Sequence, residues 1–341
     1  APGPHRRPCP ARPASPPPLP ISPTPGSNRP SSAASSTGDR EDAACAEIGL
    51  SELEFRESVG SGATAEVFKG FWDGKTVAIK QIFMQRKEGK LKQEVSFTRE
   101  VAVMSRINHP NLVRFYGVCL AEKPLCVITE FCEGQTCFEL LHRDEDVELV
   151  WKQQHKMCLD IASAMSYLHS FKPQIIHRDL KSLNLLLAKK INGPKEEPIV
   201  KVSDFGMARM KDLDAEWDKM TKAAGTCHWM APEVLTGVYD EKADVYSYSM
   251  CLFEIICREI PFEEEEGAEV MNLISEGARP DLEAVPPDCP GDLRELMIRC
   301  WSHKPENRPA FSKICDTIER IAIGDGRWAK GWTSEGKSSR S

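Results

Sequence analysis

The hydrophobic pattern of this chain changes from strand-like to helix-like part-way along its 341 residues. Between Leu53 and Phe131, short β-rich runs are broken by glycines, which predicts five strands. A charged stretch among them is expected to form one helix that stops before Pro110. From about Val147, apolar residues recur at helical spacing, and later helices are expected near 241–257, 267–276, 291–302 and 309–322. We therefore expect an α+β fold, with a sheet and one helix in the first part and mainly helices in the second.

The two ends of the chain lack this patterning. Residues 1–47 are dominated by proline, serine, alanine and arginine, and such a segment cannot bury enough apolar surface to offset its chain entropy. We expect it to be disordered. It contains PASPPPLP, a PxxP pattern that could bind an SH3-type domain, although an unstructured tail is the simpler interpretation. Residues 324–341 are polar and are also expected to be loose.

Composition excludes several classes of function. The formal net charge is −7, and no basic patch of the kind that binds nucleic acid is present. The longest strongly apolar stretch, Met250–Cys257, is far too short to span a membrane. The opening residues show no apolar signal-peptide core, and the 13 cysteines follow no disulfide framework. These features predict reduced thiols and a cytoplasmic protein, with the nucleus left open.

A pair of glycines is the first candidate for binding chemistry. Gly60 and Gly62 flank Ser61 between two predicted strands, with Val67 beyond them. Glycines there would let the backbone approach phosphate groups and act as a flexible lid. A glycine-rich turn without a ligand is the alternative, and this pattern alone does not decide between the two.

A lysine and a glutamate form the second candidate pair. Lys80 ends the apolar run that contains Ala78, and Glu100 follows inside the predicted helix. A lysine in this place is usually the solvated end of a strand. If it points inward, however, it needs an anionic partner, and pairing with Glu100 would position it against ATP phosphates.

Three further motifs follow in a fixed order. In HRDLKSLN, Asp179 could accept a proton from a hydroxyl group, and Asn184 could bind a metal ion. Asp204 and Phe205 begin an Asp-Phe-Gly motif, which alone predicts no more than a turn. An Ala-Pro-Glu motif ending at Glu233 comes next. The ordered set at these spacings is far more specific than any of its members.

With these motifs in this order, residues 48–323 resemble the eukaryotic protein kinase family. The segments GTCHWMAPEVL, HRDLKSLNLLL and CWSHKPENRPAF resemble the tyrosine-kinase-like group of serine/threonine kinases. The resemblance implies a bilobal kinase fold, with a five-stranded antiparallel sheet and one helix in the small lobe and a mainly helical large lobe. It places the small lobe and hinge at 48–134, the large lobe at 135–323, and ATP in the cleft between them.

The resemblance also implies roles in phosphoryl transfer, where positioning and charge neutralisation dominate. Lys80 would hold the α- and β-phosphates and would be oriented by Glu100. Asp179 would orient the substrate hydroxyl and accept its proton, and Lys181 would neutralise charge on the γ-phosphate. Two residues would bind Mg²⁺, namely Asn184 and Asp204.

The adenine site is implied in the same way. Thr129 would be the gatekeeper, and the backbone of Glu130 and Cys132 would pair with the adenine ring. The other residues expected around ATP are Gly60, Ser61, Gly62, Val67, Ala78 and Leu186. The chain departs from the family pattern at Ala65, which replaces a third glycine and should stiffen the lid slightly without blocking the phosphates.

Structural roles complete the resemblance. Met104, Phe115 and His177 would stack with Phe205 as a column linking the lobes. Glu233 and Arg308 would form a buried pair that pins the activation segment. Asp244 would anchor the catalytic loop, although an acidic residue at a helix start is also favoured by the helix dipole alone.

Only Thr221 and Thr226 carry hydroxyl groups between the Asp-Phe-Gly and Ala-Pro-Glu motifs. By resemblance, Thr226 bonds the catalytic aspartate and lysine. Thr221 is then the only good candidate for an activating phosphorylation, with Arg178 placed to receive the phosphate. The alternative is that Thr221 is an ordinary exposed threonine.

Several functions therefore remain to be weighed. An active serine/threonine kinase that acts on protein substrates with ATP and Mg²⁺ is preferred, because Lys181 is the choice typical of serine/threonine enzymes. A pseudokinase scaffold usually lacks the equivalent of Lys80, Asp179 or Asp204, and all three residues are present here. A tyrosine or dual-specificity kinase is the third alternative. Thr136 and Leu183 occupy positions where other groups read basic substrates, which predicts no strong basic preference; the sequence names neither substrate nor activator.

Overall fold

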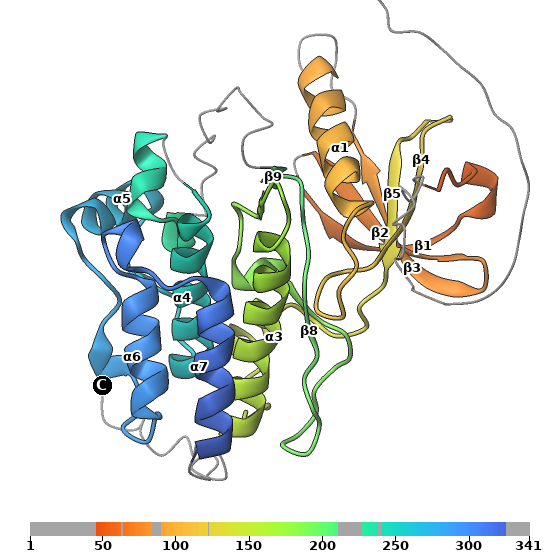
Figure 1. Ribbon diagram of the computed structural model, residues 1–341. Coiled ribbons are helices and arrows are strands. Elements are labelled where there is room, and N and C mark those ends of the chain that lie inside the picture. Colours follow the sequence, from red (N-terminus) through yellow and green to blue (C-terminus); the bar gives the residue numbers. More distant parts are fainter. Residues whose placement is uncertain are drawn as a thin grey trace, which may run out of the picture. The chain divides into compact units, whose positions relative to one another are not determined.

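The computed structural model describes residues 46–62, 64–83, 90–121, 123–210, 227–237 and 240–324 (Figure 1). By its internal contacts the chain divides into Ala1–Asp42 and Ala43–Ser341, and all described residues belong to the second unit. The PxxP segment, Thr221, Thr226 and the tail from residue 325 onward lie outside the described residues.

The first part of the described chain is the predicted five-stranded antiparallel sheet. Its strands lie in the order β1-β2-β3-β5-β4 and are β1 (Glu54–Ser61), β2 (Ala65–Trp72), β3 (Lys75–Ile82), β4 (Phe115–Cys119) and β5 (Cys126–Glu130). Asp73 and Gly74 both have positive φ, as a two-residue turn between right-twisted strands requires. The pairing places Val67 of β2 opposite Lys80 of β3.

One helix, α1 (Lys90–Met104), accompanies this sheet (Figure 1). Its Phe97 and Val103 are buried in one cluster with Val118 of β4 and Val127 of β5. This packing gives the helix a fixed face toward the sheet, so that Glu100, also buried, can meet a residue of β3.

The second part is mainly helical, as predicted. Its helices are α2 (Cys137–His142), α3 (Trp151–His169), α4 (Lys242–Cys257), α5 (Gly267–Glu276), α6 (Gly291–Cys300) and α7 (Phe311–Gly324). Short 3₁₀ turns are η1 (Leu50–Glu52), η2 (Ser182–Asn184), η3 (Cys227–Trp229), η4 (Pro232–Thr236), η5 (Leu282–Ala284) and η6 (Pro305–Asn307). Figure 1 shows α3, α4, α6 and α7 side by side, and their contacts agree.

Two details of the helical prediction were wrong. The helix expected from Val147 begins at Trp151, because the side chain of Gln153 turns back and accepts a hydrogen bond from the N–H of Val150. The six-residue α2 was not predicted. It begins at a capping box in which Thr136 accepts from the N–H of Glu139 at 3.1 Å and the Glu139 carboxylate accepts from the N–H of Thr136 at 2.9 Å.

Four short strands frame the loops of the second part. β6 (Ile175–Ile176) pairs with β9 (Arg209–Met210), and β7 (Leu185–Leu187) pairs with β8 (Val200–Val202). The segment between β6 and β7 contains HRDLKSLN, and the segment between β8 and β9 contains Asp-Phe-Gly. Both motifs are thereby held at strand ends beside each other.

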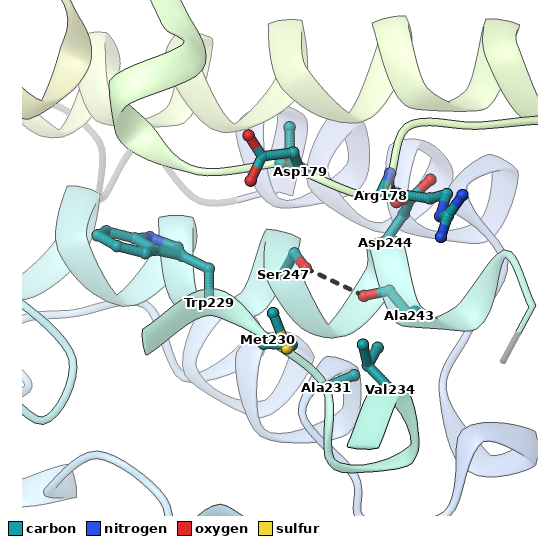
Figure 2. A pocket seen from close by; sticks show the side chains of 10 residues that line it. Arg178, Asp179, Trp229, Met230, Ala231, Val234, Ala243, Asp244 and Ser247 are labelled. Carbon is teal, nitrogen blue, oxygen red and sulfur yellow. Dashed lines mark hydrogen bonds between the residues drawn. The ribbon is translucent and has the colours of Figure 1, made fainter. Parts of the chain in front are cut away.

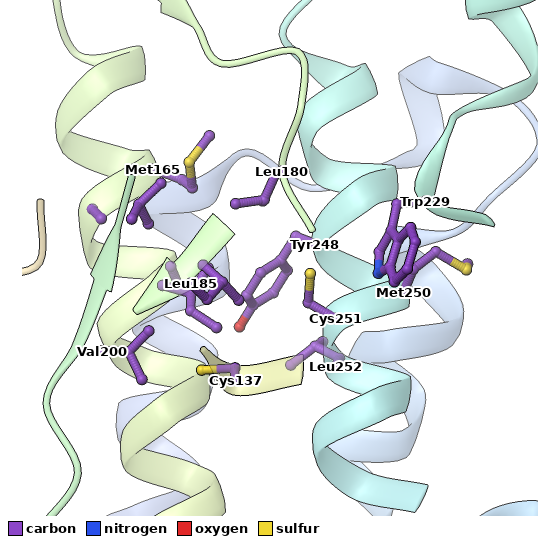
Figure 3. Packing of buried hydrophobic residues seen from close by; sticks show 14 of the residues in the cluster. Cys137, Met165, Leu180, Leu185, Val200, Trp229, Tyr248, Met250, Cys251 and Leu252 are labelled. Carbon is purple, nitrogen blue, oxygen red and sulfur yellow. The ribbon is translucent and has the colours of Figure 1, made fainter. Parts of the chain in front are cut away.

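Helix α4 is the platform for these segments, because it is buried on every side. Every residue from Ala243 to Cys257 is buried. Figure 3 shows Leu180, from the segment between β6 and β7, and Leu185 of β7 near Tyr248 and Cys251 of α4 in the main core. A helix that is mainly apolar on all sides belongs in a protein interior, and its buried polar residues need bonded partners there. Among the described residues every cysteine is free, and no helix is long and apolar enough to cross a membrane.

Candidate active site

The loop after β6 is held from below by one carboxylate. Asp244, at the start of α4, accepts hydrogen bonds from the backbone N–H groups of His177 and Arg178, each at 2.9 Å. The ring of His169 lies 2.9 Å from the same carboxylate. Figure 2 shows Asp244 beneath Arg178, with Asp179 next along the loop. Burial alone would raise the pKa of Asp244. The hydrogen bond and charge of His169, the charge of His177 and the hydrogen bond from the N–H of Arg178 together outweigh burial, and they hold the pKa of Asp244 below its ordinary value.

The variant Asp244→Asn is expected to lose about 1–3 kcal/mol of unfolding free energy at pH 7, because an amide turns one of its two accepting oxygens into a donor. The folded-state pKa of Asp244 lies below its unfolded value of about 3.9. The contribution of the carboxylate is therefore present above about pH 4 and is lost as the pH falls further. The gap in stability between wild type and variant should narrow in acid.

Urea unfolding from pH 7 to pH 3 measures this gap. Asp292→Asn, at an exposed acid of α6, is the control and should behave like wild type. A constant gap across this pH range would contradict an ionised, bonded Asp244.

The side chains of Lys181 and Asn184, which follow Asp179 in this loop, are both bonded to Asp179. The Nζ of Lys181 lies 3.0 Å and 2.9 Å from its two carboxylate oxygens. The side-chain amide of Asn184 donates to the Asp179 carbonyl at 2.8 Å and to its carboxylate at 3.0 Å. These bonds fix the orientation of the Asp179 carboxylate and keep the ammonium group of Lys181 beside it.

Lys80 joins the sheet, α1 and the Asp-Phe-Gly segment. Its ammonium group lies 2.7 Å from the carboxylate of Glu100 and 3.4 Å from that of Asp204. Burial alone would lower the pKa of Lys80, but the charges of Asp204 and Glu100 outweigh it and raise that pKa. The lysine therefore stays charged. The charge of Lys80 also lowers the pKa of the Asp204 carboxyl group, whose side chain is 47% exposed, and outweighs the cost of its partial removal from water.

The Asp-Phe-Gly segment has a constrained backbone. Asp204 has a φ of 62°, which is unusual for a residue other than glycine, and its carboxylate accepts from the N–H of Gly206 at 3.3 Å. Phe205 is fully buried, and its ring lies 5.3 Å from that of His177 in an edge-to-face arrangement. Met104 belongs to the same buried cluster, and Phe115 packs against it.

The glycines of the β1–β2 connection have free space above them. A Cβ atom at Gly60 would come no closer than 3.9 Å to another residue, and one at Gly62 no closer than 3.8 Å. Neither position therefore needs a glycine for packing. Room for close approach by a phosphate-bearing ligand explains the glycines better, and Lys80 lies two strands away on the same sheet.

The predicted hinge is fastened by a contact that the sequence did not reveal. The carboxylate of Glu130 accepts from the N–H of Arg114 at 2.7 Å and from the Nζ of Lys201 at 2.7 Å. The carbonyl of Glu130 accepts from the hydroxyl of Thr129 at 3.3 Å. Thr129 pairs with Ala78 across β3 and β5, which places the gatekeeper position beside the strand that carries Lys80.

The donor set also fits Mg²⁺ in its usual protein environment. Mg²⁺ is commonly held by one or two carboxylates together with substrate phosphates, and not by an all-protein cage. Asp204 and Asn184 offer such oxygens, and in the described part of the chain no group of three or more acidic, histidine or cysteine side chains forms a closed metal site.

Comparison with known families agrees with this geometry. The family model described as protein tyrosine and serine/threonine kinase matches residues 53–318. The chain belongs to this protein kinase family. Among its relatives, the Arabidopsis thaliana serine/threonine-protein kinase STY46 is 37% identical over 278 residues, which cover 81% of this chain and 45% of the relative.

Two dual-specificity relatives come from Dictyostelium discoideum. The kinase pyk3 is 36% identical over 277 residues, covering 81% of this chain and 19% of the relative. The kinase splA is 38% identical over 288 residues, covering 79% of this chain and 11% of the relative. The chain thus spans less than half the length of each of these relatives.

A buried ion pair ties this kinase's Ala-Pro-Glu motif to the far end of the large lobe. Arg308 is buried and donates to the two carboxylate oxygens of Glu233 at 2.5 Å and 2.9 Å. Its remaining donors reach the carbonyl groups of Ser302, Lys242 and His303. Such a bidentate, fully bonded guanidinium fixes the motif in one place.

Three residues that contact the kinase site were not predicted. Lys201 and His169 occupy ordinary positions in a strand and a helix, so no local pattern marks them. Glu254 is different, because it is a lone acid within the apolar run of α4, and it is fully buried. A charge in such a run needs buried partners, which is a signal the sequence did contain.

Proposed function

We propose that this chain is an active serine/threonine protein kinase that uses ATP and Mg²⁺. The main observation behind the proposal is that the side chains expected to bind ATP and Mg²⁺ and to accept the proton are bonded to one another in two groups. Asp179 is bonded to both Lys181 and Asn184, while Lys80 bridges Glu100 and Asp204. A scaffold without turnover would have no need for this arrangement.

Each residue of the chain then has one task. Lys80, held by Glu100, would bind the α- and β-phosphates of ATP, which supplies the γ-phosphoryl group. Asp204 and Asn184 would bind Mg²⁺. Asp179 would orient the hydroxyl of the protein substrate and take its proton, since a carboxylate at hydrogen-bond distance is a suitable general base.

Serine or threonine is the acceptor that the chain favours, because Lys181 stands beside Asp179 and can neutralise the transferred phosphoryl group. Some relatives are named dual-specificity kinases, so a share of tyrosine transfer is compatible with the family. The substrate proteins themselves are left open.

Phosphoamino acid analysis tests this function. The full chain is incubated with radiolabelled ATP and Mg²⁺ on a generic basic protein, and the product is hydrolysed and separated. Phosphoserine and phosphothreonine are expected, and omission of Mg²⁺ should abolish the signal. Absence of any transfer would favour a scaffold, and phosphotyrosine alone would overturn the proposed acceptor.

The gatekeeper position gives a second expected result. Thr129 is small, so inhibitors with a bulky group reaching behind the adenine ring should bind. In Thr129→Met the longer side chain should raise their Kd at least tenfold, or about 1.4 kcal/mol, while the Kd of ATP stays within about twofold. Calorimetry measures both. Thr98→Met, at an exposed site on α1, is the control, and equal inhibitor affinity in Thr129→Met would show that Thr129 does not border that pocket.

The segment between the Asp-Phe-Gly and Ala-Pro-Glu motifs gives a third expected result. If phosphorylation of Thr221 orders this loop, Thr221→Ala should lower activity severalfold, since a phosphate adds about −1.5 to −2 charge and three strong acceptors. Phosphatase treatment of the wild type should produce the same loss. Mass spectrometry of the active enzyme identifies the modified residue, and fully active enzyme with unmodified Thr221 would contradict the switch.

A further inference from the structure

A buried carboxylate in α4 is not used by the roles above. Glu254 has no exposed surface, and it lies between Phe253 and Ile255 in the apolar helix. Its carboxylate accepts a hydrogen bond from the hydroxyl of Ser182 at 2.5 Å and from the indole N–H of Trp229 at 2.6 Å. The Nε2 of His142 lies 3.0 Å from it. Since an unpaired buried charge is costly, these contacts hold the carboxylate in place.

The three partners of Glu254 belong to three different segments. Ser182 directly follows Lys181 and precedes Asn184 by two positions, and both of these residues are bonded to Asp179. Trp229 lies in η3, just before the Ala-Pro-Glu motif. His142 is the last residue of α2. One carboxylate therefore joins the loop that carries Asp179, the turn η3 before the Ala-Pro-Glu motif, and the helix α2.

Stability alone does not account for a charge at this position. A buried carboxylate with polar partners is often no more stabilising than apolar residues of similar volume, and the neighbouring residues of this helix from Met250 to Cys257 are apolar. The carboxylate instead fixes the positions of three segments relative to one another. Trp229 Nε1 meets one oxygen, while Ser182 and His142 meet the other, so displacement of one segment disturbs the bonds of the next.

We propose that Glu254 is a positioning residue for phosphoryl transfer. Through Ser182 it fixes the stretch that carries Lys181 and Asn184 around Asp179, and through Trp229 it fixes the segment η3, which directly follows Thr226, the residue expected by resemblance to bond Asp179. The catalytic loop and that segment thereby reach their working arrangement together. This inference rests on the proposed kinase activity.

Ser182→Ala and Glu254→Gln test the inference in the full chain. Each should lower kcat about tenfold, a change that corresponds to about 1.4 kcal/mol, because each change weakens a hydrogen bond to the carboxylate that holds the loop. The KM for ATP should stay within about twofold, since Lys80 and the glycines bind it elsewhere. In the double variant the losses should be clearly less than multiplicative, because both changes act on the same contact between Ser182 and residue 254.

Ser249→Ala is the matched control. Ser249 is a fully buried serine of the same helix, and its hydroxyl donates within α4 to the carbonyl of Tyr246 at 2.6 Å. This variant should lower the melting temperature about as much as Ser182→Ala while leaving kcat unchanged. Equal kcat losses in Ser249→Ala and Ser182→Ala would reduce Glu254 to a structural role and overturn the inference.

Amide hydrogen exchange gives a readout that does not depend on activity. Exchange in peptides covering 177–187 and 227–231 should rise in Glu254→Gln and stay at the wild-type level in Ser249→Ala. Unchanged exchange in both peptides would overturn the inference even in an active enzyme. A wild type that transfers no phosphate would instead overturn the proposed function, and the exchange rates would still decide the role of Glu254.

Discussion

Replacement of Asp179 by asparagine is expected to lower kcat by about 10²–10⁴-fold, the usual loss when a positioned general base is removed. Asparagine has nearly the same shape, but it cannot accept the substrate proton at neutral pH. It also turns one oxygen that faces Lys181 and Asn184 into a donor. Under the proposed function the phosphates of ATP are bound by Lys80 and the glycines of the other lobe and not by Asp179, so affinity for ATP should change little.

Steady-state kinetics and nucleotide titration of the purified full chain measure both quantities. Asp316→Asn is the control, because Asp316 is an exposed acid of α7 whose side chain lies 3.3 Å from the Nζ of the exposed Lys313. It should keep wild-type kcat and ATP affinity. Wild-type turnover of Asp179→Asn would refute the base, and loss of ATP binding in parallel would mean that the substitution unfolds the loop.

Glu233→Ala is expected to cost about 3 kcal/mol of stability and to lower the melting temperature by roughly 6–12 °C. Removal of one partner from a buried ion pair typically costs about 3–5 kcal/mol, because the other charge stays buried without compensation. The lower end applies here, since Arg308 keeps its bonds to three carbonyl groups. The Ala-Pro-Glu motif would at the same time lose its attachment to the end of the large lobe.

Thermal melting followed by circular dichroism measures this change. Asp316→Ala removes one partner of an exposed pair, in which the side chains are 75% and 55% accessible, and such pairs contribute little. Its melting temperature should fall by no more than about 2 °C. A similarly small change for Glu233→Ala would show that the buried pair does not hold the motif.

Local patterns predicted most of the fold. The five strands and α1 follow from short β-rich runs and one charged periodic stretch, and α3 to α7 follow from apolar residues at helical spacing. The misses lie where a few side chains decide. The start of α3 depends on Gln153 capping Val150, and α2 on the reciprocal bonds of Thr136 and Glu139. Such caps shift an element boundary without changing the hydrophobic period.

The candidate site divides along the same line. The motifs identified the charged residues, because phosphoryl transfer needs a lysine, a base and metal ligands in a fixed order. With the resemblance they also implied that Glu100 pairs with Lys80 and that Asp244 anchors the loop, but they did not reveal the further partners of these residues. Glu130 is bonded to Lys201, 71 positions away, and Asp244 to His169, 75 positions away.

The sequence by itself determined the element types, the family and the identity of the reactive side chains, since these depend on periodicity and on residue chemistry at short spacing. The pairs of Lys80 with Glu100 and of Glu233 with Arg308 were expected, but the tertiary structure alone decided the other contacts. Lys80 reaches Asp204 across 124 positions, and Glu254 receives Ser182 across 72 and His142 across 112. Contacts over such separations depend on how a sheet and several helices pack around α4, and burial then makes each polar group find a partner. No local pattern encodes that choice, because the partners come together only in the folded chain.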